Sequence, residues 1–215
     1  LTVTSSDAST GTCPVVVTRT YLVVDACGNT TADIVHTINI QDTTAPVVTG
    51  TITASTLQGC DASDAPAAET TVSGLEGLTG DLMIADACTA DGVSTVTSSD
   101  ASTGTCPLVI TRTYTVKDAC DNTSVNIVHT INVDDTTAPV VTGSITASTV
   151  EGCDANDAPA AVTTVAALEA LTGDLAIADA CTADGSLVVA SSDASAGTCP
   201  VVVTRTYTVT DACDN

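Results

Sequence analysis

The sequence predicts an all-β protein made of tandem sandwich domains that repeat every 93 residues. The content of Val, Ile and Thr is that of pleated sheet. Short apolar runs alternate with clusters of Gly, Asp, Asn and Pro, which is typical of strands joined by turns. The stretch DACGNTTADIVHTINIQDTTAPVVTG at 25–50 returns as DACDNTSVNIVHTINVDDTTAPVVTG at 118–143. A period of this length exceeds that of helical solenoids and suits one whole sandwich domain per repeat.

The repeat sets the expected domain limits. Residues 46–122 and 139–215 agree at about 60 of their 77 positions. We expect the C-terminal part of one repeat at 1–42, a complete repeat at 43–135, and at 136–215 a repeat that lacks its last strand. No signal peptide is visible, so we expect an internal piece of a longer secreted chain.

Five strands and one short helix are expected in the complete repeat. The strands are predicted at 47–55, 82–85, 94–98, 108–116 and 125–133, the last as the hairpin partner of the fourth. Between the first two, TTVSGLEGL at 70–78 fits either one turn of helix or a crossing strand. Its copy TTVAALEAL at 163–171 carries better helix formers, so we favour the helix.

The long strand at 108–116 alternates strictly. Ile110, Arg112, Tyr114 and Val116 fall on one face, and threonines fall on the other. This alternation indicates that one side packs inward. Together with the strand spacing, it predicts an immunoglobulin-like β-sandwich for each repeat.

Charge and aromatic content narrow the class of protein. Only four Lys and Arg side chains face 26 Asp and Glu, for a formal net charge of -22. Nucleic acid and anionic membranes are therefore excluded as partners, because both need neutralising cations. No apolar run approaches the 18 residues of a membrane span. The chain has no Trp, no Phe and three Tyr, so its aliphatic cores need another source of stability.

Cysteine is the expected source. The ten cysteines form no C-x-x-C pair, so they indicate a disulfide framework in an oxidising, extracellular compartment and not a zinc site. Cys106 and Cys120 bracket about ten extended residues, roughly 33 Å, and cannot pair with each other. If strands alternate in direction, Cys88 joins Cys120 at one end of the sandwich, and Cys60 joins Cys106 at the other. The full expectation is two disulfides per repeat: Cys88–Cys120 and Cys60–Cys106, then Cys181–Cys213 and Cys153–Cys199. Pairing of Cys60 with Cys88 stays open as an alternative.

Acidic residues gather where one repeat meets the next. They are Asp134 and Asp135 in the linker, and Asp179, Asp184, Asp211 and Asp214 in the loops of the following repeat. The complete repeat carries the same loops, with Asp86, Asp91, Asp118 and Asp121 around its cysteines. Such oxygen-rich clusters are what Ca²⁺ requires, so calcium is the candidate cofactor. The alternative is that these are solvated turn residues, since Asp and Asn are ordinary turn formers and no EF-hand pattern is present.

Nothing in the sequence indicates catalysis. His36 and His129 occupy the same position of IVHTIN, and a lone histidine on a strand is more often structural than catalytic. Arg112 and its copies Arg19 and Arg205 are expected to form ion pairs within a domain or to pack over tyrosine. No nucleophile, base and orienting group recur together.

The combination TGTCPLVITRTYTVKDACDN at 103–122 and IVHTINVDDTTAPVV at 127–141 resembles a known repeat type. It is similar to the Cys-containing, HYR-like, immunoglobulin-like repeats of giant Bacteroidetes surface proteins, including gliding-motility adhesins of the SprB type. The resemblance covers the whole chain and implies a very large extracellular protein whose repeats form a filament. It also implies an O-glycosylation pattern, which Thr43 and Thr136 match.

Two functions are compatible with these patterns. The first is a non-catalytic stalk or filament of a bacterial surface adhesin, whose partners are neighbouring repeats and other copies of the filament. The second is a polyvalent module in which each repeat binds carbohydrate or a neighbouring filament. The loops of the two copies are nearly identical, whereas positions such as 93–97 vary. Uniform loops favour the spacer.

Overall fold

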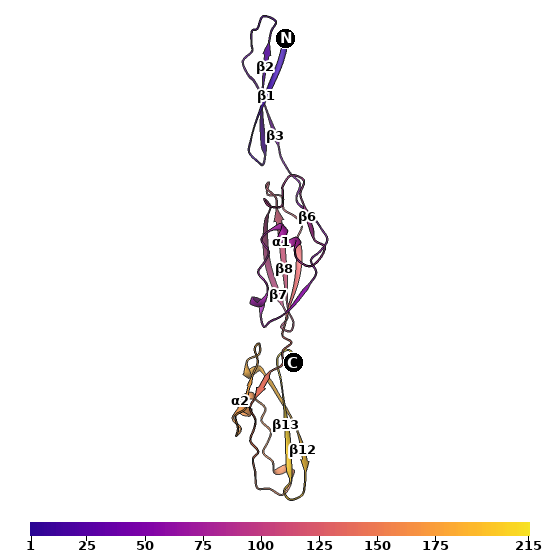
Figure 1. Ribbon diagram of the computed structural model, residues 1–215, viewed down its shortest axis with the longest axis vertical. Helices are drawn as coiled ribbons and strands as arrows, with labels where there is room; N and C mark the ends of the chain where they lie inside the picture. The colour runs from indigo at the N-terminus through magenta and orange to yellow at the C-terminus, as the bar shows by residue number, and fades with distance from the viewer. The chain divides into compact units, whose positions relative to one another are not determined.

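Strands dominate the computed structural model, which describes residues 1–215 and confirms the all-β prediction (Figure 1). The strands are β1 (Thr2–Thr10), β2 (Val15–Val24), β3 (Ile34–Ile40), β4 (Val47–Thr49), β5 (Ser55–Gln58), β6 (Met83–Ala85), β7 (Thr95–Thr103), β8 (Leu108–Lys117), β9 (Ile127–Asp134), β10 (Val140–Thr142), β11 (Ala176–Ala178), β12 (Val188–Ala196) and β13 (Val202–Thr210). The helices are α1 (Val72–Glu76) and α2 (Val165–Glu169), with short 3-10 turns at Ala62–Asp64, Ala155–Asp157 and Asp184–Ser186.

The chain divides into two compact units, each of which combines parts of two successive sequence repeats. Unit 1 consists of Leu1–Ala54, Ala67–Ala101 and Thr111–Thr130, and unit 2 of Ser55–Pro66, Ser102–Ile110 and Ile131–Asn215. The domain limits expected from the sequence, 1–42, 43–135 and 136–215, stay a prediction. Each unit contains one junction between repeats, and the two junctions can therefore be compared.

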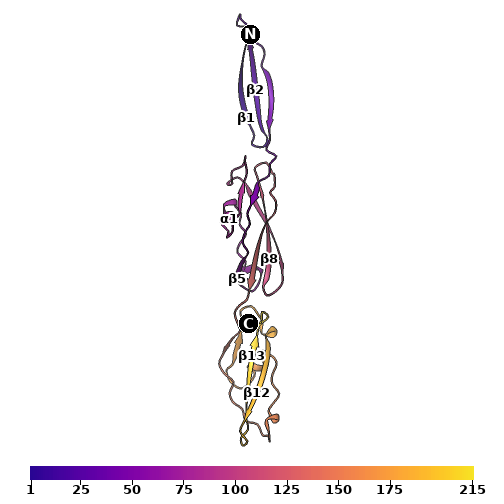
Figure 2. The same ribbon diagram turned by 90° about the vertical axis from the view of Figure 1, so that its right-hand side faces the viewer.

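The sheets follow the 93-residue period. Antiparallel pairs β1–β2 and β12–β13 have equivalent registers, in which Asp7 lies opposite Arg19 and Asp193 opposite Arg205. The short pairs β4–β6 and β10–β11 are also equivalent. In the second repeat the strand order is β5-β9-β8-β7, with β5 parallel to β9. Figure 2 labels β5 and β8 of this sheet. The same sequence therefore produces the same pairings wherever both strands are present.

The expected short helix is confirmed in both copies. The side chain of Thr71 caps α1 by accepting a hydrogen bond from Gly74 N at 3.0 Å. Val72 and Leu75 are the buried residues of this helix. Because they are one turn apart, they place one apolar face against the core.

The core of unit 1 is built around Tyr114. Its ring is buried among aliphatic side chains, and its hydroxyl accepts a hydrogen bond from Glu69 N at 3.2 Å. The packed residues are Ile52, Val72, Leu75, Leu82, Ile84, Val116 and Ile127. Unit 2 has one cluster of Val165, Leu168, Ile177 and Leu187, and another of Ile110, Ile131 and Val133. The predicted alternation of β8 is confirmed, because its inward positions are buried and its threonines are more exposed.

The predicted strand at 47–55 is interrupted. β4 ends at Thr49, and Gly50 follows with a φ of 71°, where a Cβ would collide with the main-chain oxygen of Asp81. The Asp81 side chain then accepts a hydrogen bond from Thr51 N at 2.8 Å. The turn that results releases the chain from one sheet before β5 joins another, a strand that the sequence pattern did not predict.

Candidate metal centres at the repeat junctions

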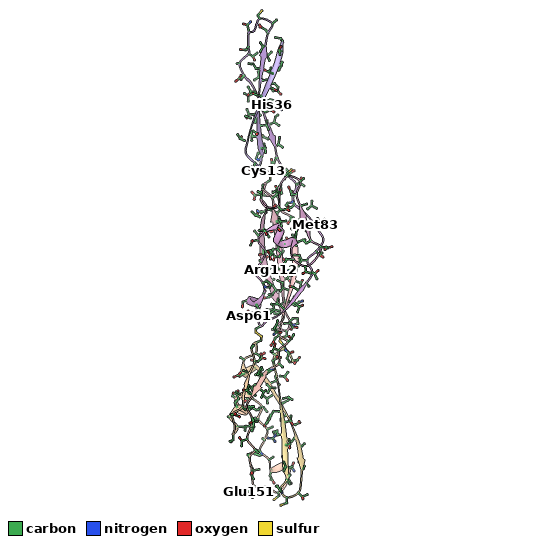
Figure 3. All side chains as sticks on the ribbon, in the orientation of Figure 1. Cys13, His36, Asp61, Met83, Arg112 and Glu151 are labelled. Carbon is green, nitrogen blue, oxygen red and sulfur yellow. A yellow bond between two sulfur atoms is a disulfide. The ribbon has the colours of Figure 1, made fainter.

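Three disulfides connect successive repeats. Cys13 bonds Cys120 and Cys106 bonds Cys213, each across 107 residues, with Cα–Cα distances of 5.3 and 5.4 Å. These two bridges are related by the 93-residue period. Cys60 bonds Cys181 with a Cα–Cα distance of 4.8 Å and adds a second bridge to the junction in unit 2. Figure 3 shows Cys13 at the turn between β1 and β2. The bridges indicate an oxidising environment.

The pairing predicted within each repeat is wrong. Cys88–Cys120, Cys60–Cys106, Cys181–Cys213 and Cys153–Cys199 are absent, and so is the alternative Cys60–Cys88. The expected grouping of the cysteines is still correct, since Cys88 and Cys120 lie in unit 1 and Cys60 and Cys106 in unit 2. Cys120, Cys60 and Cys106 each bond a cysteine of another repeat, whereas Cys88 is free. The exclusion of Cys106–Cys120 is confirmed.

Four cysteines are free and exposed: Cys27, Cys88, Cys153 and Cys199. Cys27 is the copy of Cys120, and Cys88 is the copy of Cys181. At the observed separations of 107 and 121 residues, neither has a partner among residues 1–215. Cys153 and Cys199, the copies of Cys60 and Cys106, likewise have no partner at these separations within the chain.

Each junction also contains three converging aspartates. One carboxylate oxygen from each of Asp42, Asp86 and Asp118 lies within 4.8 Å of the other two. The second set has the same geometry 93 residues later and consists of Asp135, Asp179 and Asp211. We call these sets triad 1 and triad 2.

Two members of each triad are positioned by tight loops of the sequence Asp-Ala-Cys. The Oδ1 atom of Asp86 accepts hydrogen bonds from Cys88 N at 2.8 Å and Thr89 N at 2.7 Å. Asp118 Oδ1 likewise accepts from Cys120 N at 2.7 Å. Short aspartate side chains that bond the backbone two residues later are typical turn formers. These loops fix one oxygen of each carboxylate.

The third member comes from the linker between repeats. Asp42 Oδ1 accepts from Thr44 N at 3.0 Å, and Asp135 Oδ1 accepts from Thr137 N at 3.0 Å. The linker is also tied to the following repeat. Asn122 Nδ2 donates to the main-chain oxygen of Asp42 at 3.3 Å. In unit 2 the equivalent bond from Asn215 to Asp135 is 2.7 Å.

The carboxylates are poorly solvated. Asp118, Asp135 and Asp211 are 5%, 6% and 3% exposed. The Oδ2 atoms of Asp42, Asp86 and Asp135 are buried without a hydrogen-bond partner. An ionised oxygen in that state is costly unless a cation compensates it.

Two of the buried carboxyls are held in their charged form. Burial opposes ionisation of Asp118, but hydrogen bonds from Asn122 and Cys120 N outweigh it and leave the pKa of Asp118 below its ordinary value. For Asp211, burial is again outweighed, here by hydrogen bonds from Asn215 and Cys213 N, which lower its pKa. The charge of triad 1 extends to a neighbour, because Asp42 raises the pKa of the Cys88 thiol.

All four basic side chains form ion pairs with aspartates outside the triads. Arg112, which is labelled in Figure 3, donates two hydrogen bonds of 2.8 Å to Asp100, and its side chain is only 7% exposed. The other pairs are Arg19–Asp7, Arg205–Asp193 and Lys117–Asp121. The expected ion pairs of the arginines are thus confirmed.

The structure brings together three of the six predicted calcium ligands, namely Asp135, Asp179 and Asp211. Asp134 is half-buried at the end of β9, where its main-chain oxygen accepts from Gly59 N. Asp184 and Asp214 are exposed turn residues outside triad 2. These three belong to the same loops and linker but do not join the cluster. Triad 1 was missed as a set, although the 93-residue period relates each member to triad 2.

The remaining candidate residues are two threonines and two histidines. Thr136 is exposed, and its hydroxyl donates to Gln58 Oε1 at 2.6 Å. Thr43 is also exposed, and glycosylation at both stays a prediction. His129 is buried, and burial together with Arg112 lowers its pKa, whereas His36 is exposed.

No protein-family model matches the chain, and no curated protein or solved structure resembles it significantly. None of its helices has the length and apolar character needed to cross a membrane.

Proposed function

We propose that the chain is a structural segment of the stalk or filament of a large secreted bacterial surface adhesin, and that it has no catalytic role. The observation that carries this proposal is the pair of equivalent disulfides, Cys13–Cys120 and Cys106–Cys213. They recur with the sequence period and join one repeat to the next. A covalent link at every junction serves a protein that bears load, and an isolated binding domain does not need it.

The bridges shorten the covalent path through the chain. A pulling force applied at residues 1 and 215 passes from Cys13 to Cys120, back along β8 to Cys106, and across to Cys213. That path contains only about 31 residues, which extend to roughly 100 Å. Without the bridges all 215 residues carry the load and extend to roughly 750 Å. The pairing therefore limits how far the chain unravels under tension.

The free cysteines fit the same role. In a longer array, Cys27 and Cys88 would bond the preceding repeat, and Cys153 and Cys199 the following one. Each junction would then carry two bridges, as the junction in unit 2 does with Cys60–Cys181 and Cys106–Cys213. The resemblance to HYR-like repeats of Bacteroidetes adhesins and the location at a cell surface are part of this proposal.

Single-molecule force spectroscopy tests the load-bearing role. The oxidised chain, held at its two ends, is expected to reach an end-to-end length of no more than roughly 100 Å before rupture. The same molecule in reductant is expected to approach roughly 750 Å. Full extension of the oxidised chain would contradict the proposal. In the source organism, antibodies against the chain should label intact cells, and labelling only after permeabilisation would rule out a surface filament.

A further inference from the structure

We propose that triad 1 and triad 2 each bind one hard divalent cation, with Ca²⁺ as the favoured ion. The inference goes beyond the load-bearing role, because the disulfides perform that role without a metal. Its failure would leave the proposed function intact.

The carboxylate oxygens of each triad are arranged as they would be in a cation site. Hard cations bind carboxylate oxygens, and Ca²⁺ does so at 2.3–2.6 Å. Oxygens within 4.8 Å of one another can therefore share one ion of this kind. In triad 1, Asp42 and Asp86 each have one oxygen fixed by backbone N–H groups and a second, buried oxygen without a partner. Carbonyl oxygens and water would complete the six to eight ligands that Ca²⁺ takes.

Burial in triad 2 gives an independent reason. Asp135 is 6% exposed, its Oδ1 accepts from Gln58 and Thr137, and its Oδ2 is buried without any partner. Asp211, which is 3% exposed, lies in the same set. Like charges at this distance repel strongly in a poorly solvated site, and every Lys and Arg side chain of the chain has another acidic partner. A bound cation removes both the repulsion and the unpaired oxygen.

The donor atoms that the two junctions share indicate the class of metal. Cys88 and Asp42 of triad 1 line the same cavity. The copy of Cys88 in unit 2 is Cys181, whose sulfur is bonded to Cys60. No thiolate is therefore common to the two triads, and neither contains histidine. All-oxygen donors favour Ca²⁺ over the softer metals that cysteine and histidine bind.

A cation in each triad would join three segments. They are the linker, the loop after β6 or β11, and the loop after β8 or β13. Asn122 and Asn215 already connect the linker to one of these loops by a hydrogen bond. The ion would thus add a reversible crosslink beside each disulfide.

Isothermal titration of the oxidised, EDTA-treated chain with CaCl₂ tests the proposal, and MgCl₂ and ZnCl₂ serve as comparison titrants. We expect two Ca²⁺ per chain. Asp86→Asn and Asp179→Asn should each remove one site or weaken it at least about tenfold, because asparagine keeps the turn-forming oxygen but loses the charge. Asp184→Asn and Asp214→Asn are matched controls from the same loops and should keep both sites.

Disulfide mapping and circular dichroism verify that each variant is folded. Absence of Ca²⁺ binding at millimolar concentration would overturn the proposal. Binding of Zn²⁺ in preference to Ca²⁺ would overturn it too, and so would two Ca²⁺ sites of unchanged affinity in the Asp86→Asn and Asp179→Asn variants.

Discussion

Removal of the Cys106–Cys213 bridge is expected to destabilise unit 2 by an amount that the covalent topology determines. With Cys60–Cys181 still closed, the shortest ring that this bridge completes contains about 78 residues. The loop-closure relation then gives about 4.5 kcal/mol at 25 °C for the double variant Cys106→Ser, Cys213→Ser. Native-state strain commonly reduces such values, so the working expectation is about 3–4 kcal/mol.

Urea denaturation, followed by circular dichroism, measures this cost. For a denaturant slope of about 2 kcal/mol/M, the midpoint of the unit 2 transition should fall by about 1.5–2 M. Cys199→Ser is the matched control, because Cys199 occupies the same repeat position as Cys106 but is free and exposed. A double variant within about 0.5 kcal/mol of the parent would refute the reasoning. Equal losses in the double variant and in Cys199→Ser would refute it as well.

Three further changes test the packing and electrostatics of the second repeat. Tyr114→Phe leaves the Glu69 N–H without its acceptor, so the free energy of unfolding should fall by about 1–2 kcal/mol in a denaturation experiment, and an unchanged value would show that this bond contributes nothing. Gly50→Ala should cost about 2 kcal/mol or more because of its positive φ and the collision at Cβ, whereas Gly92→Ala, in open space, should stay within about 0.5 kcal/mol; equal costs would contradict the assigned turn. The arginine hydrogen bonds lower the pKa of Asp100 from 3.8, so its ion pair should contribute stability above about pH 4 and lose it as the pH falls through the lowered pKa. Asp100→Asn should therefore cost about 1.5 kcal/mol at pH 7 and progressively less as the pH falls through the lowered pKa, and a cost independent of pH would exclude this explanation.

Local patterns were sufficient for most strands and for the helix. The alternation around Tyr114 identified the inward face of β8, because one side of a strand repeats every second residue. The helix was predicted from the better helix formers in its second copy, and Thr71 and Thr164 cap the two copies. The interruption after β4 was missed, since it depends on a contact between Gly50 and Asp81 that lie 31 residues apart in the sequence.

Disulfide connectivity could not be predicted from one repeat considered alone. The sequence grouped Cys60 with Cys106 correctly, but their partners Cys181 and Cys213 belong to the next repeat. Strand direction limits which cysteines share an end of a domain, and it does not reveal what that end contacts. The equivalence of Cys13 with Cys106 does not resolve the pairing either, because both pairing schemes obey the same period.

The segments that form the aspartate triads were predictable from the sequence, but the individual members were not. The sequence indicated an acidic linker that meets two acidic loops, and this brought Asp135, Asp179 and Asp211 into one candidate set. Which of the neighbouring acidic residues point inward depends on the turn geometry. Asp211 bonds its own loop and is buried, whereas Asp214, at a φ of 66°, is exposed. Composition alone does not predict such a difference between two residues three positions apart.

Disulfide mapping by mass spectrometry of the non-reduced chain, cleaved at aspartates, tests the central claim most directly. Abundant aspartates separate the cysteines into distinct peptides. We expect a peptide that contains Cys60 bonded to one that contains Cys181, and Cys106 bonded to Cys213. Recovery of Cys60 bonded to Cys106, within a single repeat, would contradict the account.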